Sequence, residues 1–334
     1  MALPTYSKTV NTVFTLAARL HLKTVFTDNF YTRCPALTAL RSKKISKPGG
    51  DTLVVPVKVG ASALGGYYDR FGTLNMQDVD DASEAQYNWA FSYEPIVISH
   101  QDYWKCRGSD VKMKELTTFK TDDAIDRLKT AMATALYAAS PATNALQGLP
   151  VAIADAPSSS GAYGLLDGAS TAQSGWRNYT NTSVGSFASN GVDALTTMFR
   201  YIADNSDVGK PQWAFTDPTT WGYIHSKVIG HYDIRAQVTN ETDRMYADLG
   251  FQVLNFMGTT IVSDRYCTSG TIYCGSDAAA QLVEMEGAQI QLHPDGFVSG
   301  LSNNQMCWKS AVIANHQFVT YERRGLGKAS GITA

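Results

Sequence analysis

The feature that most constrains this sequence is a long loop of aromatic and acidic residues enclosed by two strand-like runs. Residues 51–59 alternate aliphatic and polar side chains, and residues 87–93 alternate aromatic with smaller ones, as half-buried β-strands do. The connection at residues 64–85 reads LGGYYDRFGTLNMQDVDDASEA. A loop of this length is entropically unfavourable to order within one chain. We therefore predict two long strands joined by a wide excursion, whose tip gains a use if it buries against an adjacent subunit.

Composition and charge describe a globular chain without a global affinity for nucleic acid. Of its 334 residues, 44% are hydrophobic, and 28 Lys and Arg stand against 30 Asp and Glu, which excludes disorder as a whole and any strong overall charge. No apolar run approaches the ~20 residues that span a bilayer, and the N-terminus lacks the pattern of a signal peptide. We expect neither secretion nor membrane insertion, and we expect residues 10–22 to form a packed helix rather than part of a transit peptide.

The motifs that would indicate catalysis or ligand binding are missing from the sequence. The five cysteines never form a CxxC pair, so we predict reduced core thiols, and neither HxH, HExxH nor GxSxG occurs. The acidic run at 78–81 departs from the EF-hand pattern, and the tail RRGLGKASG departs from P-loop spacing. We therefore expect no catalytic, cofactor or metal site and no enzyme activity. The tail is predicted to be an edge strand that ends in a flexible basic segment.

Helices and strands are grouped along the chain without regular alternation, which predicts the α+β class. The clearest predicted helix is at residues 121–139, with Thr121 as N-cap, two acidic residues after it and one apolar stripe. Residues 154–175 are rich in Gly, Ser and Ala and are expected to form ordered loops. Helices are predicted at 191–205 and from Asp217 onward, and the pattern after residue 251 is mostly extended.

The one dense positive cluster comprises Arg41, Lys43, Lys44 and Lys47. Contact with nucleic acid there would be weak, independent of sequence and sensitive to salt. A solvated strand or arm that needs no partner is the preferred interpretation. Pairing with the acidic tip of a neighbouring subunit is a third.

The order of these parts, more than any single motif, resembles the major capsid protein of tailed bacteriophages. The segments LQGLPVAI, GWRNYTNT, PQWAFTDPTTWGYI and ANHQFVTYERRG are similar to segments of such shell proteins. The resemblance implies the capsid fold that this family shares with encapsulins and herpesvirus capsid floors. Its parts would be an N-terminal arm at 1–48, an E-loop hairpin at 49–95 containing the excursion, a peripheral domain with a long spine helix at 96–140, an axial domain at 141–305, and a peripheral return strand with C-terminal tail at 306–334.

The resemblance assigns the tip of the excursion to contacts between subunits. Its apolar side chains would bury against a neighbour, and its charges would set the register. Some shells of this family join subunits covalently through an E-loop lysine, but residues 60–86 contain no lysine, so we expect non-covalent stabilisation. The predicted tip contacts are Tyr67, Tyr68, Asp69, Arg70, Phe71, Met76, Asp78, Asp80, Asp81 and Glu84, and the predicted arm contacts with another subunit or with DNA are Arg41, Lys43, Lys44 and Lys47.

The leading hypothesis is a structural shell subunit that assembles into pentamers and hexamers of an icosahedral head around double-stranded DNA. Its partners would be further copies of itself, DNA through weak non-specific contacts, and scaffolding, decoration and portal proteins where the virus has them. It would reside in the virion and, during assembly, in the host cytoplasm. One alternative, with the same fold, is an encapsulin-like compartment. Others are a tail or baseplate protein, and a soluble β-rich hydrolase or carbohydrate-binding protein that stacks Trp213, Trp221 or Trp308 on its ligand.

Overall fold

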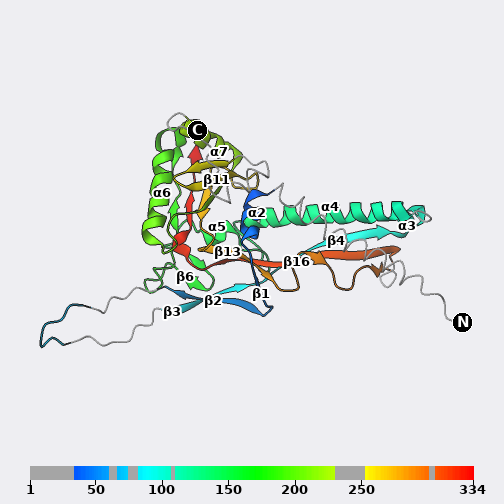
Figure 1. Cartoon of the computed structure of the whole chain (residues 1–334), viewed down its shortest axis with the longest axis horizontal. Helices are drawn as coiled ribbons and strands as arrows, with labels where there is room; N and C mark the ends of the chain where they lie inside the picture. Colours follow the sequence, from blue (N-terminus) through cyan, green and yellow to red (C-terminus); the bar gives the residue numbers. More distant parts are fainter. Residues whose placement is uncertain (1–33, 60–65, 74–81, 107–109, 230–252, 301–304) are drawn as a thin grey trace.

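The computed structural model describes residues 34–59, 66–73, 82–106, 110–229, 253–300 and 305–334. Within these ranges the chain forms two six-stranded sheets and three short two-stranded ones. Figure 1 shows a long helix lying along the first sheet, a block of helices and strands at one end of that helix, and a hairpin that projects away from both. The helix predicted at residues 10–22 lies outside the described residues.

The first sheet is built around the long strand β16 (Cys307–Thr320). On one side β16 pairs with β4 (Ala90–Ser99), and on the other it pairs in turn with β13 (Ala280–Met285), β14 (Gln291–Leu292) and β15 (Val298–Ser299). Strand β1 (Ile45–Lys47) extends the sheet by pairing in parallel with β13. All pairings of β16 are antiparallel, so this one strand holds together segments that are far apart in the sequence.

A long helix, α4 (Asp110–Leu136), packs on β4 and follows the short helix α3 (His100–Cys106). The predicted stripe of Ile125, Leu128, Met132 and Leu136 is buried, which confirms the periodicity. The helix nevertheless begins at Asp110 and not at Thr121. The Thr121 hydroxyl donates to the carbonyl of Thr117 at 2.7 Å, so it bonds backward along a continuing helix instead of capping a new one.

The hairpin of the excursion consists of β2 (Thr52–Lys58) and β3 (Ala82–Asn88), which pair antiparallel. The second strand was predicted at 87–93, but that run is divided between β3 and β4. Trp89 and Ala90 are both buried, so the alternation of faces breaks there. Phe91 and Tyr93 consequently point to solvent, although the sequence pattern placed them on the same face as Tyr87.

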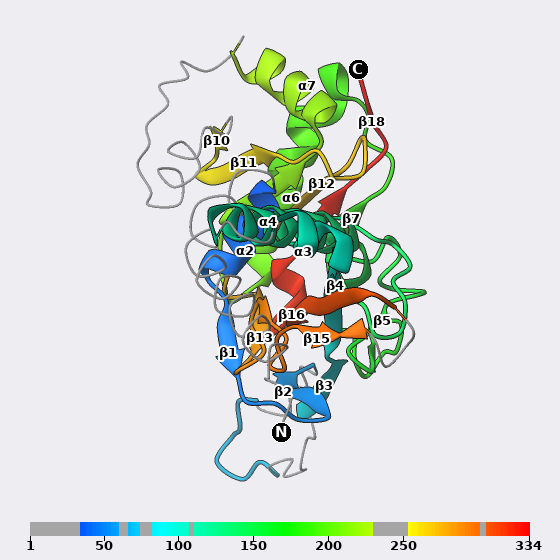
Figure 2. The ribbon, with the colours of Figure 1, turned by 90° about the vertical axis from the view of Figure 1, so that its right-hand side faces the viewer.

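The second sheet has the order β10 (Val253–Phe256), β11 (Thr259–Ser263), β9 (Trp213–Thr216), β12 (Ile272–Gly275), β17 (Gly327–Ala329) and β7 (Tyr179–Asn181). It is accompanied by α6 (Val192–Asn205), which continues the π-helical turn η2 (Phe187–Gly191), and by α7 (Pro218–Ile229) (Figure 2). The predicted N-cap of α7 is confirmed, because Asp217 accepts hydrogen bonds from the backbone of Thr219 and Thr220 at 3.1 and 3.2 Å.

The C-terminal segment is not the flexible edge that the sequence predicted. After the 3-10 turn η4 (Arg323–Gly325), strand β17 lies inside the second sheet between β12 and β7, and β18 (Ile332–Thr333) pairs with β8 (Gly185–Ser186). A Cβ on Gly327 would lie 2.9 Å from Ile202 Cδ1 and 3.0 Å from Cys274 Sγ. Gly327 therefore permits close packing within this segment.

A short buried helix, α2 (Pro35–Ser42), contacts α4, β11 of the second sheet and β13 of the first. The part of the predicted arm that the structure describes is thus packed into the body. The expected ordered loops follow the short helix α5 (Leu149–Ala152) and contain the small hairpin of β5 (Ala162–Tyr163) and β6 (Leu166–Asp167). These loops lie near the base of the excursion, where the Gln86 backbone donates to the carbonyl of Gly164 at 2.9 Å.

Candidate assembly surfaces

The described part of the tip of the excursion is an ordered turn with exposed aromatic side chains. The backbone of Gly72 donates to the carbonyl of Asp69 at 2.8 Å, and the backbone of Arg70 donates to the Asp69 carboxylate at 2.7 Å. The Arg70 guanidinium lies 5.6 Å from the centre of the Phe71 ring. Tyr67, Tyr68 and Phe71 are among the most exposed large apolar residues described. Several exposed aromatic residues in one turn favour burial in an intermolecular contact.

The other predicted tip residues are placed only in part. Glu84 lies on β3, opposite Pro56 of β2, and is exposed. Met76, Asp78, Asp80 and Asp81 lie outside the described residues. The prediction that the acidic group sets the register between subunits therefore stays a prediction.

Two members of the predicted basic cluster are bound within their own chain. Arg41 is only 5% exposed, and its Nε donates to Glu284 Oε1 at 2.6 Å, while Lys44 Nζ lies 2.5 Å from Glu284 Oε2. Burial alone would raise the pKa of Glu284, but Arg41 and Lys44 outweigh it and hold this pKa below its usual value. Lys43 is exposed and Lys47 half-buried, so the predicted contact with another subunit or with DNA rests on these two.

Strand β4 carries an exposed apolar surface that was not predicted from the sequence. Phe91 is 59% exposed and Tyr93 70% exposed, and Val97 and Val298 are exposed on the same face of the first sheet, opposite α4. Ile96 and Ile98, which alternate with them along β4, are buried. The sequence of β4 could have indicated this surface, since both faces of the strand are rich in apolar residues. A strand that is apolar on both faces indicates a covered sheet, and among the described residues one face of β4 is open.

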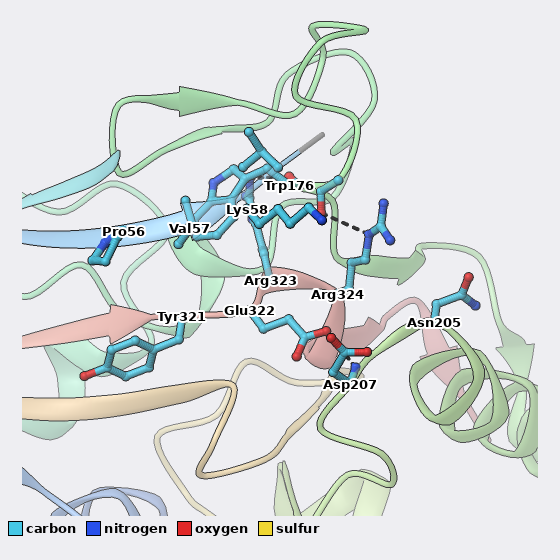
Figure 3. A pocket seen from close by; sticks show the side chains of 12 residues that line it. Pro56, Val57, Lys58, Trp176, Asn205, Asp207, Tyr321, Glu322, Arg323 and Arg324 are labelled. Carbon is cyan, nitrogen blue, oxygen red and sulfur yellow. Dashed lines mark hydrogen bonds between the residues drawn. The ribbon is translucent and has the colours of Figure 1, made fainter. Parts of the chain in front are cut away.

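A pocket of about 450 Å³ lies at the base of the excursion (Figure 3). The end of β2, the loop around Trp176, the segment after α6 and the segment after β16 line it. Figure 3 shows Lys58 and Arg324 on one side of the pocket and Glu322 and Asp207 on the other. No local sequence pattern predicts this pocket, because its residues come from four separate segments.

Two of the three tryptophans considered for carbohydrate stacking belong to the core. Trp213 is buried and stacks on Phe215 with ring centres 4.9 Å apart, and Trp308 is buried beside His100. Trp221 is half-buried and stacks on His225 at 4.8 Å. Flat, exposed rings are needed to stack on a sugar, so Trp213 and Trp308 do not support that alternative.

The described ranges contain no group of three or more His, Cys, Asp or Glu side chains that could hold a metal ion. Within the same ranges, no helix has the length and apolarity that crossing a membrane requires. The five cysteines form no disulfide with one another; Cys34, Cys267, Cys274 and Cys307 are buried, as predicted for core thiols, and Cys106 is half-buried.

Comparison with solved structures finds chains of viral and related shells. The chain is 16% identical to a chain of the cyanophage A-1(L) capsid, with a TM-score of 0.69, covering 92% of this chain and 95% of that one. A capsid chain of an empty GTA particle has 10% identity and a TM-score of 0.57, covering 87% and 95%. A capsid chain of the Myoviridae phage XM1 has 9% identity and a TM-score of 0.51, covering 88% and 92%. No protein-family model and no curated protein sequence matches the chain. The likenesses confirm the predicted α+β capsid fold.

Proposed function

We propose that this chain, which has the fold of tailed-phage capsid proteins, is a major capsid protein that assembles into an icosahedral head. The observation that carries the proposal is the likeness to the cyanophage capsid chain, which extends over nearly the whole of both chains. The exposed aromatic turn of the excursion and the open apolar face of β4 support it, because both need a partner surface. Pentamers and hexamers around double-stranded DNA, a location in the virion and assembly in the host cytoplasm belong to the same proposal.

The proposed contacts between copies involve the tip of the excursion, the face of β4, and Lys43 and Lys47. Because heterologous contacts of this kind repeat around a ring, modest energies per contact suffice to hold a shell. Scaffolding, decoration and portal proteins are further partners that the proposal admits. Contacts with DNA through Lys43 and Lys47 would be few and sensitive to salt.

The test is to express the chain, alone and with its genetic neighbours, and to examine the product by size-exclusion chromatography and negative-stain electron microscopy. Closed shells are the expected result, and a chain that stays monomeric at high concentration in every combination would overturn the proposal. Nuclease-protected DNA in particles purified from an infection separates a viral head from an encapsulin-like compartment. Particles that hold a protein cargo and no DNA would favour the compartment.

A further inference from the structure

The pocket at the base of the excursion presents two positive and two negative side chains that are not neutralised locally. Lys58 comes from β2 and Arg324 from η4, while Glu322 follows β16 and Asp207 follows α6. None of the four forms an ion pair with another residue in the described part of the chain. Lys58 and Asp207 are exposed, and the other two are half-buried. Four unpaired charges around one cavity of about 450 Å³ indicate a site for a charged occupant.

The charges are sorted by sign across the pocket. In Figure 3 the side chains of Lys58 and Arg324 lie above the cavity, and the carboxylates of Glu322 and Asp207 lie together below it. The two acidic residues are joined by a hydrogen bond from the Asp207 backbone to Glu322 Oε1 at 3.0 Å. Arg324 is oriented by its bond to the carbonyl of Gly175 at 3.1 Å. This arrangement favours an occupant that carries one negative and one positive group side by side.

The tip of the excursion carries this pair of charges. Asp69 and Arg70 are adjacent and form the corner of the turn that the bond from Gly72 to Asp69 closes. Tyr68 and Phe71 flank them, and all four side chains are exposed. The pocket offers Pro56 and Tyr321 beside its charges as apolar surface for these rings. Because the turn is already formed in the free chain, little conformational entropy is lost when it binds.

We propose that the turn at residues 69–72 of one copy inserts into the base pocket of a neighbouring copy. Asp69 then pairs with Lys58 and Arg324, and Arg70 pairs with Glu322 and Asp207. The proposal rests on the proposed shell function and names the receiving site for the tip. In Figure 1 the described tip lies far from strand β2, whose end lines the pocket, so a copy does not fill its own pocket. The contact is therefore heterologous, and repetition of it builds a closed ring or an open chain of subunits.

The test reverses the charge on each side of the proposed contact and then on both. Lys58→Glu and Asp69→Lys are each expected to reduce the fraction of subunits in particles about tenfold, because one lost favourable pair and one new repulsion amount to more than ~1.4 kcal/mol. The double variant Lys58→Glu/Asp69→Lys restores one pair of opposite charges and is expected to assemble better than either single variant, while Arg324 still repels the new lysine. Lys105→Glu, an equal change at an exposed lysine on α3, serves as the control and should assemble like the unmodified chain.

A direct measurement distinguishes this contact from other places for the tip. In the variant Lys58→Cys/Asp69→Cys, a short bis-maleimide should link copies into a ladder of dimers and higher species, and in Lys58→Cys or Asp69→Cys alone it should not. A loss of assembly in Asp69→Lys without any effect of Lys58→Glu, or no ladder in assembled particles, would place the tip elsewhere and overturn the inference. Shells formed by the unmodified chain would leave the proposed function standing in that case.

Discussion

Arg323 is buried where three loops meet at the base of the excursion. Its Nε donates to the carbonyl of Ala152 at 2.7 Å, and its Nη1 donates to the carbonyls of Gly161 and Trp176. Burial lowers the pKa of Arg323 to about 10, so the guanidinium keeps its proton at neutral pH. One side chain thus donates hydrogen bonds to carbonyls from three separate segments of the chain.

Replacing Arg323 with methionine should destabilise the folded chain strongly. The change keeps most of the volume but leaves three buried carbonyls without a donor, and we expect a loss of about 3 kcal/mol or more in the free energy of unfolding. Denaturant titration of the subunit measures this loss. Arg324→Met is the matched control, because Arg324 is half-buried and bonds to the single carbonyl of Gly175. Equal stability of the two variants would contradict this role of Arg323.

His316 is a buried titratable group on β16, opposite Glu284 of β13. Burial lowers the pKa of His316 to about 4 from its usual 6.5. The unfolded chain therefore takes up this proton at a higher pH than the folded chain does, and stability falls as the pH drops from about 6.5 to about 4. The full difference corresponds to an effect on the order of 3 kcal/mol.

We expect His316→Leu to flatten the dependence of stability on pH in this window. The variant lacks the group whose protonation destabilises the fold, so its free energy of unfolding should change less than that of the unmodified chain between pH 6.5 and 4. Chemical denaturation at a series of pH values measures the slope. His293→Leu, at an exposed histidine, should leave the slope as it is. An unchanged slope in His316→Leu would show that other groups dominate acid sensitivity.

At the scale of elements, helix α2 is anchored to both halves of the molecule. At its first turn the backbone of Ala36 donates to Asp264 after β11 at 3.2 Å, and near its end Arg41 pairs with Glu284 of β13. The pKa of Asp264 is raised because the carboxyl is buried, although hydrogen bonds from the backbone of Tyr266 and Ala36 oppose the shift. One short helix is thus fixed by a carboxylate from each large sheet.

Glu284→Gln should loosen this anchor. The substitution leaves the buried Arg41 without its counter-charge, and breaking a buried ion pair from one side costs about 3–5 kcal/mol. We expect a lower free energy of unfolding at pH 7 and faster amide hydrogen exchange in α2 and β1 than in α6. Glu286→Gln, at an exposed position just beyond the same strand, is the control. Unchanged exchange in α2 would mean that packing alone holds the helix.

The elements that sequence could predict are those whose signal is local. The stripe of α4, the cap at Asp217 and the alternation of β2 each depend on neighbouring residues, and the structure confirms all three. Two predictions were wrong because they depend on tertiary packing: the start of the long helix at Thr121 and the continuous strand at 87–93. The helix begins at Asp110, and the run 87–93 is divided at Trp89 between β3 and β4. Trp89 and Ala90 are both buried at the junction of β3 and β4, and the alternation of side chains along one strand does not predict such a junction.

At the scale of the whole molecule, the order of elements was enough to predict the fold, but not the surfaces. The base pocket gathers Lys58, Asp207, Glu322 and Arg324 from distant segments, which only the folded chain brings together. Arg41 and Lys44 looked like part of an exposed arm, yet Glu284, 240 residues or more away, binds both. Contacts that depend on such distances in sequence have no local signature.

The open face of β4 predicts that two substitutions there reduce assembly without destabilising the folded subunit. The rings of Phe91 and Tyr93 are exposed to solvent in the free subunit and are not part of its core. The double variant Phe91→Thr/Tyr93→Thr keeps strand propensity. It should therefore change the free energy of unfolding by only about 0.5 kcal/mol. If copies meet on this face, each lost ring removes interface area worth on the order of 1–2 kcal/mol. Because every subunit repeats the contact, the fraction of subunits in particles should fall at least about tenfold. Light scattering after size-exclusion chromatography measures assembly, and denaturation of the unassembled subunit measures stability.

Leu165→Asn is the control for loss of an exposed apolar side chain. Leu165 is an exposed turn residue with a φ of 61°, which asparagine adopts readily. Normal assembly of the double variant would exclude this face as a contact between copies, whereas lost assembly with unchanged stability would locate one of the shell's interfaces on the side of the first sheet opposite α4.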